Sequence, residues 1–98
     1  MQRNKSINDV ADPFVTGLKL LAHVVADADL GARFLALTGL TADDLRQRAA
    51  DAGVLAALVD FVAARETDLV AAADAIGVAP EAIVAAGRSL GGDTEQWT

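Results

Sequence analysis

Residues 87–91, Gly-Arg-Ser-Leu-Gly, match the G-x-S-x-G pattern that presents the nucleophile of many serine hydrolases. The pattern works where a strand turns sharply into a helix, which exposes the serine, and where a histidine from later in the chain can activate it. In this sequence a helix is predicted to precede the pattern, and the single histidine, His23, lies far upstream. We therefore expect Ser89 to have no role in catalysis.

A second pattern, at residues 27–31, resembles the start of a calcium-binding loop because aspartates occupy its first and third positions. An EF-hand loop also requires an oxygen ligand at its fifth position, glycine at the sixth and glutamate at the twelfth. Those positions hold Gly31, Ala32 and Thr38, so the pattern is incomplete. Asp29 is better explained as the cap of a helix that begins there.

Few other residues could support catalysis or metal binding. The chain has no cysteine and one histidine, which leaves no disulfide, no thiol nucleophile and no zinc site of the usual type. His23 lies on the polar side of its predicted helix, four residues after Lys19, where we expect it to be solvated. We predict no catalytic, cofactor-binding or metal-binding residue, and therefore a protein that is not an enzyme.

Residues 69–90 have the pattern of a helix-turn-helix, with small residues in the first helix, Gly77 in the turn and a second helix from Pro80. In DNA-binding proteins the second helix reads bases mainly through its first residues, and lysine or arginine side chains bind the phosphates around it. Here the second helix offers Glu81 at its start and Arg88 only near its end. We keep a DNA-binding regulator as the alternative function and do not expect nucleic acid as a partner.

The composition favours a contact with another protein. The residues AVILMFWYC make up 53% of the chain and the 8 glycines are additional, whereas typical domains reach about 45–50% with glycine included. A chain of 98 residues builds only one core, so some apolar surface is expected to remain uncovered on a monomer. We therefore predict a non-catalytic module that binds another protein or a second copy of itself.

Charge and segment lengths indicate a cytoplasmic protein. The net charge is −6 and the isoelectric point about 4.4, which disfavours adhesion to anionic membranes and nucleic acids. The N-terminal residues are polar, unlike a signal peptide. The longest apolar segment, 52–64, is interrupted by Asp60 and is shorter than the ~20 residues that a membrane span needs. We expect neither export nor membrane insertion.

Helix starts and stops are marked clearly along the chain. The expected N-terminal caps are Asp12, Asp29, Thr41, Asp51 and Thr67, and proline opens the helices at positions 13 and 80. Gly39 and Gly77 are placed to end helices in the left-handed conformation. No segment alternates as a strand would. The sequence therefore predicts an all-α fold of five or six short helices.

Apolar residues at helical spacing predict the inward faces of these helices. The expected inward sets are Phe14, Leu18, Leu21 and Val25 in the first helix and Leu30, Phe34 and Leu37 in the second. Asp44 and Arg48 are four residues apart and are expected to pair on the surface. Segment 51–65 is apolar almost all round, which is typical of a helix covered by its neighbours. We expect a compact bundle around this central helix.

The ends of the chain differ from the middle in composition. Residues 1–11 are predicted to form a flexible polar arm, residues 12–91 a single helical domain, and residues 92–98 a flexible tail. The tail carries Trp97, the only tryptophan. Tryptophan is a frequent anchor at protein interfaces, so Trp97 is a candidate partner contact, with an undocked tail as the other possibility.

Three segments together resemble a known family. They are 33–40 (RFLALTGL), 44–46 (DLR) and 54–61 (VLAALVDF), followed by Glu66. In this order and spacing the chain resembles, from about residue 15 to 90, the short alphaproteobacterial proteins labelled domain of unknown function 3572. The resemblance implies a compact helical cytoplasmic protein and supplies no catalytic or ligand-binding residues.

Overall fold

The computed structural model describes residues 12–91, which fold into helices joined by short loops. The helices are α2 (Pro13–Ala26), α3 (Ala28–Thr38), α4 (Ala42–Gln47), α5 (Ala52–Ala63), α6 (Glu66–Ile76) and α7 (Pro80–Leu90). The described part contains no strand. The predicted all-α class, with five or six short helices, is confirmed. The predicted arm (1–11) and tail (92–98), with Trp97, lie outside the described residues.

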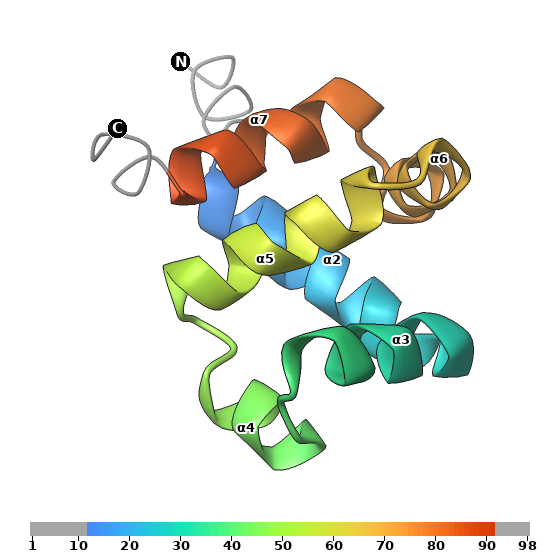
Figure 1. Ribbon diagram of the computed structural model, residues 1–98. Coiled ribbons are helices and arrows are strands. Elements are labelled where there is room, and N and C mark those ends of the chain that lie inside the picture. The colour runs from blue at the N-terminus through green and yellow to red at the C-terminus, as the bar shows by residue number, and fades with distance from the viewer. Residues whose placement is uncertain (1–11, 92–98) are drawn as a thin grey trace.

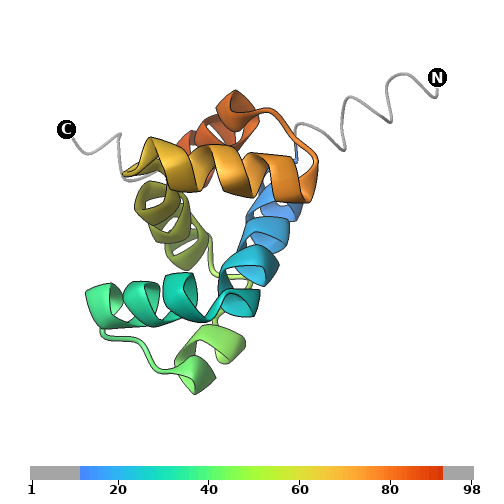
Figure 2. The same ribbon diagram turned by 90° about the vertical axis from the view of Figure 1, so that its right-hand side faces the viewer.

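Two helices, α2 and α5, cross at the centre of the bundle. Helix α5 packs against α2, α6 and α7, and α2 packs against α3, α5, α6 and α7. Helix α4 lies beyond α3 at the end of the molecule opposite α7, as both views show (Figures 1 and 2). The central helix predicted at 51–65 is therefore present, and α2 shares its position.

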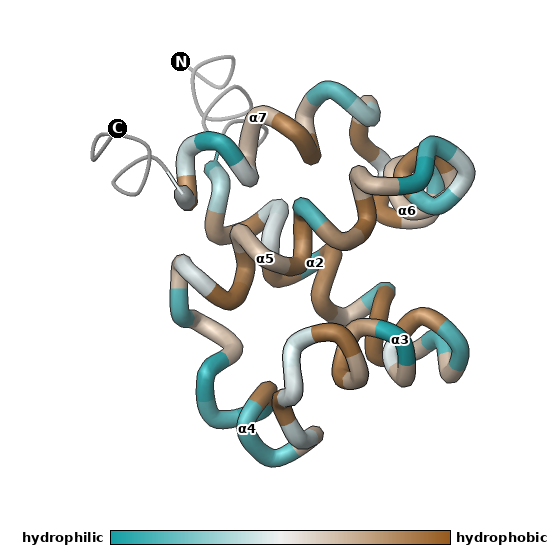
Figure 3. The backbone as a smooth tube through the Cα atoms, in the orientation of Figure 1, coloured by the Kyte–Doolittle hydropathy of each residue, from teal (hydrophilic) through white to brown (hydrophobic). Residues whose placement is uncertain are grey.

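The core forms where these helices cross. Its largest fully buried side chains come from four helices and are Leu20, Val24, Phe34, Leu55, Leu58, Val62 and Ile83. Figure 3 shows the apolar stretches of α2 and α5 meeting at the centre, with hydrophilic residues on α4 and on the outer turns of α6 and α7. One face of α5, with Gly53, Ala57 and Asp60, remains exposed to solvent. The core is therefore built on one side of α5 and does not surround it.

Arg33 joins three helices at the edge of this core. Its guanidinium pairs with Asp29 at 3.2 Å within α3 and with Asp68 of α6 at 3.3 Å. It also lies 5.5 Å from the centre of the Phe61 ring, which packs on Phe34 with the ring centres 5.4 Å apart. The cation and the aromatic pair together connect α3 to α5 and α6.

The buried face of α2 differs from the prediction. Only Leu21 of the expected inward set is buried, whereas Phe14, Leu18 and Val25 are 41%, 42% and 55% exposed. The buried residues are instead Thr16, Gly17, Leu20, Leu21 and Val24. The small Gly17 allows α5 to come close, because a Cβ there would lie 3.1 Å from Cδ1 of Leu55. The small residue at this position therefore lets α2 and α5 pack closely.

Four smaller predictions are also wrong. Leu37 is 70% exposed, because α3 turns Leu30 and Phe34 inward and places Leu37 on its far side. Asp27, not Asp29, caps α3 by accepting hydrogen bonds from the amides of residues 29 and 30. Helix α6 begins at Glu66, one residue before the predicted cap Thr67, and has no side-chain cap. Arg48 pairs with Asp51 at 3.6 Å instead of with Asp44.

The remaining helix boundaries follow the local signals in the sequence. Thr41 and Asp44 form a reciprocal capping box, with hydrogen bonds of 3.0 and 3.1 Å to each other's amides. Asp51 caps α5 through the amides of Gly53 and Val54. Gly39 and Gly77 both have φ +78° and end α3 and α6.

These caps predict a loss of stability in acid. Hydrogen bonds from the backbone amides of Val54 and Gly53 lower the pKa of Asp51, and those from the amide and hydroxyl of Thr41 lower the pKa of Asp44. Because both carboxyls bind a proton less readily in the folded chain, the stability they add is present above their unfolded pKa of about 4 and is lost as pH falls through the folded values.

We expect the urea midpoint of the double variant Asp44→Asn/Asp51→Asn to fall less than that of the original protein between about pH 5 and pH 2. Asparagine keeps an oxygen that can cap a helix but does not titrate, so the variant tests the charge alone. Parallel pH profiles for the two proteins would contradict this prediction.

Candidate functional site

The residues with potential chemistry do not form one site. The G-x-S-x-G residues 87–91 form the last turn of α7, where Ser89 is exposed, and not a strand-to-helix elbow. His23 lines a different part of the surface, where α2 meets Ala75 and Ile76 of α6. Within residues 12–91 no group of three or more His, Asp or Glu side chains could hold a metal ion. These residues therefore give no support for a hydrolase or metal centre.

The calcium-like aspartates have structural roles. Asp27 accepts hydrogen bonds from the amides of Asp29 and Leu30 and so begins α3. The carboxylate of Asp29 pairs with Arg33, one turn further along that helix. Both groups are satisfied by interactions within the protein, as expected for a helix start.

Several exposed apolar residues lie along α2. Phe14, Leu18, Leu21 and Val25, here called the α2 seam, follow one another at spacings of four, three and four residues. This spacing places them in one line on a helix and is the spacing at which a second helix packs. Since three of the four are 41–55% exposed, the described part of the chain leaves most of the α2 seam uncovered.

A groove beside the α2 seam deepens this surface. It has a volume of about 370 Å³ and lies between α2 and α4. Its lining residues are Leu18, Leu21, Ala22, Val25, Ala42, Leu45, Arg46 and Ala49. Leu45 is 6% exposed and forms part of the floor. Arg46 stands at the rim, 74% exposed and paired with Asp43. The arrangement, apolar within and polar at the rim, is typical of a protein-binding surface.

Sequence reasoning missed this surface because it placed the α2 seam in the core. Helix α2 carries apolar residues on almost every side, so periodicity alone could not choose between two faces. One signal was available in Thr16 and Gly17, which are small residues on the same side as Leu20 and Val24. Small residues mark the place where two helices come closest, and that face is the one α5 covers.

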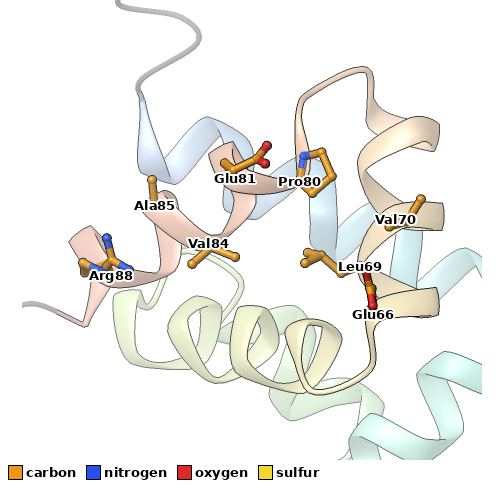
Figure 4. Close-up of a pocket in the computed structure, with 8 residues that line it drawn as sticks. All are labelled: Glu66, Leu69, Val70, Pro80, Glu81, Val84, Ala85 and Arg88. Atoms are coloured by element: carbon orange, nitrogen blue, oxygen red, sulfur yellow. The ribbon is translucent and has the colours of Figure 1, made fainter.

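A second groove lies at the corner between α6 and α7 (Figure 4). Its apolar part comes from Leu69 and Val70 of α6 and from Pro80, Val84 and Ala85 of α7, and Val70 is 49% exposed. The charged residues Glu66, Glu81 and Arg88 stand around it. In residues 12–91 none of these three side chains forms a salt bridge. The groove thus offers the carboxylate of Glu66 at the start of α6, that of Glu81 at the start of α7, and one guanidinium near the far end of α7.

The same corner has the geometry of a helix-turn-helix. Helices α6 and α7 are inclined at 98° and joined by residues 77–79, with Gly77 in the left-handed conformation. Angles of about 90–120° and a turn of three or four residues characterise that motif. The start of α7, which would face DNA, instead presents the carboxylate of Glu81. A carboxylate at this position repels the phosphates that a reading helix must approach.

Within residues 12–91 no single helix has the length and apolar character to cross a membrane, and α6 with α7 passes that test only as a pair bent by 98°.

Comparison with known proteins identifies a family and little more. No curated protein and no solved structure matches the chain. A family model does match, over residues 10–93, which include every helix of the described structure and both grooves. The match confirms the resemblance carried by residues 33–40, 44–46 and 54–61. The chain belongs to the family described as Protein of unknown function (DUF3572).

Proposed function

We propose that this chain is a non-catalytic interaction module that binds another protein, or a second copy of itself, through the α2 seam and the groove beside it. The observation that carries the proposal is the exposure of Phe14, Leu18 and Val25 along one line of α2. A monomer this small rarely leaves such residues together on its surface without a use for them.

The size of the surface sets the strength of the contact. Fully burying one large apolar side chain contributes about 1.5–3 kcal/mol, so a side chain that is already half-buried can contribute roughly 1 kcal/mol more. Three such residues fall short of the ~4–15 kcal/mol that association costs in lost motion. A stable complex must therefore also fill the groove over Leu21 and Leu45, which favours an inserted side chain of the partner as the anchor.

The proposal that the module is non-catalytic rests on which reactive residues the sequence contains and on where they lie in the structure. The only histidine and the serine of the G-x-S-x-G pattern lie on different parts of the surface. We propose no cofactor or metal. The absence of cysteine and the acidic composition support a reducing cytoplasm as the location.

Leu18→Glu tests this function directly. Because Leu18 is 42% exposed, we expect the variant to keep its fold while losing at least about tenfold in affinity for whatever binds the α2 seam, since a carboxylate would be buried in an apolar contact. Sedimentation across a wide concentration range detects self-association, and affinity capture from the cell of origin, with and without nuclease, detects other proteins.

The matched control is Ala71→Glu, which makes the same change in charge at an exposed site of α6 outside both grooves. The control should behave as the original protein does. If the original protein remains a monomer and all three eluates contain the same proteins, the interaction function is wrong.

A DNA-binding regulator remains the second candidate, because α6 and α7 have the helix-turn-helix angle. Fluorescence anisotropy with a labelled mixed-sequence duplex at low salt tests it, since non-specific binding is strongest there. We expect no binding. Binding that weakens steeply with added salt would favour the DNA-binding alternative.

A further inference from the structure

The charges around the α6–α7 groove require a partner of particular chemistry. Glu66 and Glu81 lie on different sides of an apolar floor that includes Leu69 and Val84, and Arg88 lies near the far end of α7 (Figure 4). Both carboxylates are exposed, and neither is neutralised by a salt bridge from residues 12–91. A segment that fits this corner carries basic side chains beside an apolar one.

The chain itself contains one segment of that chemistry outside the described residues. Among residues 1–11 stand Arg3 and Lys5, followed by Ile7. Of the 8 lysines and arginines in the whole chain, these two are the ones that precede α2. Residues 1–11 therefore offer two positive side chains and an apolar side chain within five positions, followed by one carboxylate at Asp9. The basic pair is complementary to the two glutamates, and Ile7 is complementary to the apolar floor.

The point of attachment brings this segment within reach of the groove. Residues 1–11 continue from Asp12, the cap of α2, and α2 packs directly against α7. One turn into α2, a Cβ on Gly17 would lie 3.4 Å from the side chain of Leu90 in α7. The nine residues from Asp12 back to Arg3 span up to about 30 Å when extended, whereas Glu81 and Arg88 are separated by about 10 Å along their helix.

We propose that residues 1–11 act as an intramolecular ligand of the α6–α7 groove, with Arg3 and Lys5 at Glu66 and Glu81 and with Ile7 over Val84 and Ala85. A tethered segment of this length experiences an effective concentration of about millimolar, so contacts that would be weak between separate molecules hold it in place for part of the time. The contact covers the acidic start of α7, and it weakens with salt because its charges are exposed. This inference uses a different surface from the α2 seam and does not depend on the proposed function.

A spin label on residues 1–11 tests the proposal in the full chain. The sequence has no cysteine, so Ser6→Cys gives a single attachment site between Lys5 and Ile7. In the ¹⁵N-labelled protein we expect the label to broaden the amide signals of residues 66–70 and 80–85. Loss of this broadening is expected in the double variant Glu66→Lys/Glu81→Lys, and also at about 1 M salt, where the Debye length is about 3 Å.

The matched control is Asp60→Lys/Asp74→Lys, which makes the same change in net charge at two exposed positions outside the groove. This control should keep the broadening. Broadening confined to the first turn of α2, or unchanged by the Glu66→Lys/Glu81→Lys exchange, would overturn the proposal. A mixture of spin-labelled protein without ¹⁵N and ¹⁵N protein without the spin label shows which molecule supplies the segment. Broadening of residues 66–70 and 80–85 in this mixture would assign the groove to a second copy, against the intramolecular contact proposed here.

Discussion

Leu58→Ala is expected to lower the free energy of unfolding by about 2–5 kcal/mol. Leu58 is fully buried on α5, where that helix faces the core. The substitution removes apolar atoms from water-free surroundings and leaves a cavity that the packed helices cannot close completely. Urea unfolding followed by circular dichroism measures the change, and the two-state approximation is appropriate for a domain of this size.

Leu37→Ala is the matched control, because it makes the same substitution in a helix where the side chain is 70% exposed. We expect it to change stability by no more than about 0.5 kcal/mol. The two variants distinguish the structure from the sequence pattern, because the pattern places both Leu37 and Leu58 in the core. Similar losses from the two variants, or a loss below about 1 kcal/mol at Leu58, would contradict the arrangement of α3 and α5.

Gly87→Ala is expected to destabilise the protein although alanine is the better helix former. A Cβ at position 87 would lie 2.5 Å from Cγ1 and 2.8 Å from Cβ of Val59, which is buried on α5. Relieving such an overlap between packed helices costs about 1–3 kcal/mol, more than the gain of up to about 1 kcal/mol from replacing glycine by alanine in a helix. The net result is a loss of stability, measured by the same urea titration.

The partner substitution Val59→Gly removes the overlapping atoms. In that background Gly87→Ala should no longer destabilise the protein, and the helix-forming preference of alanine should appear instead. The double-mutant cycle then gives a coupling of about 0.5–3 kcal/mol between the two positions. Independent, additive effects at 59 and 87 would show that α5 and α7 do not approach each other as closely as the structure places them.

The close approach of α7 to α5 at Gly87 also explains why a glycine begins the G-x-S-x-G pattern. Gly87 lets α7 pack on Val59, and Gly91 follows the last residue of the helix. Helix packing thus requires the first glycine of the pattern for a reason unrelated to catalysis, whereas Gly91 has φ −98°, an angle open to any residue.

The two candidate grooves depend on the sequence in different ways. The α6–α7 corner was visible beforehand as a helix-turn-helix pattern, and its acidic character could be read from Glu81 at the start of α7. The second carboxylate, Glu66, lies fifteen positions earlier, and only the folding of α6 against α7 places both residues along one groove. The α2–α4 groove was not anticipated, because the sequence pattern placed Leu18, Leu21 and Val25, which line it, in the core.

The sequence by itself determined the all-α class, most of the helix boundaries and the shortage of chemically active residues. Capping box, N-terminal proline and left-handed glycine act through hydrogen bonds and backbone angles within a few residues, so their effects are local and readable. Only the tertiary structure decided which side of α2 is buried. Its two faces have similar apolar character, and the choice depended on how closely Gly17 lets α5 approach. The other face of α2, with Phe14, Leu18 and Val25, therefore remains exposed. Packing energy arises between two helices, so the sequence of one helix alone does not show which of its faces is buried.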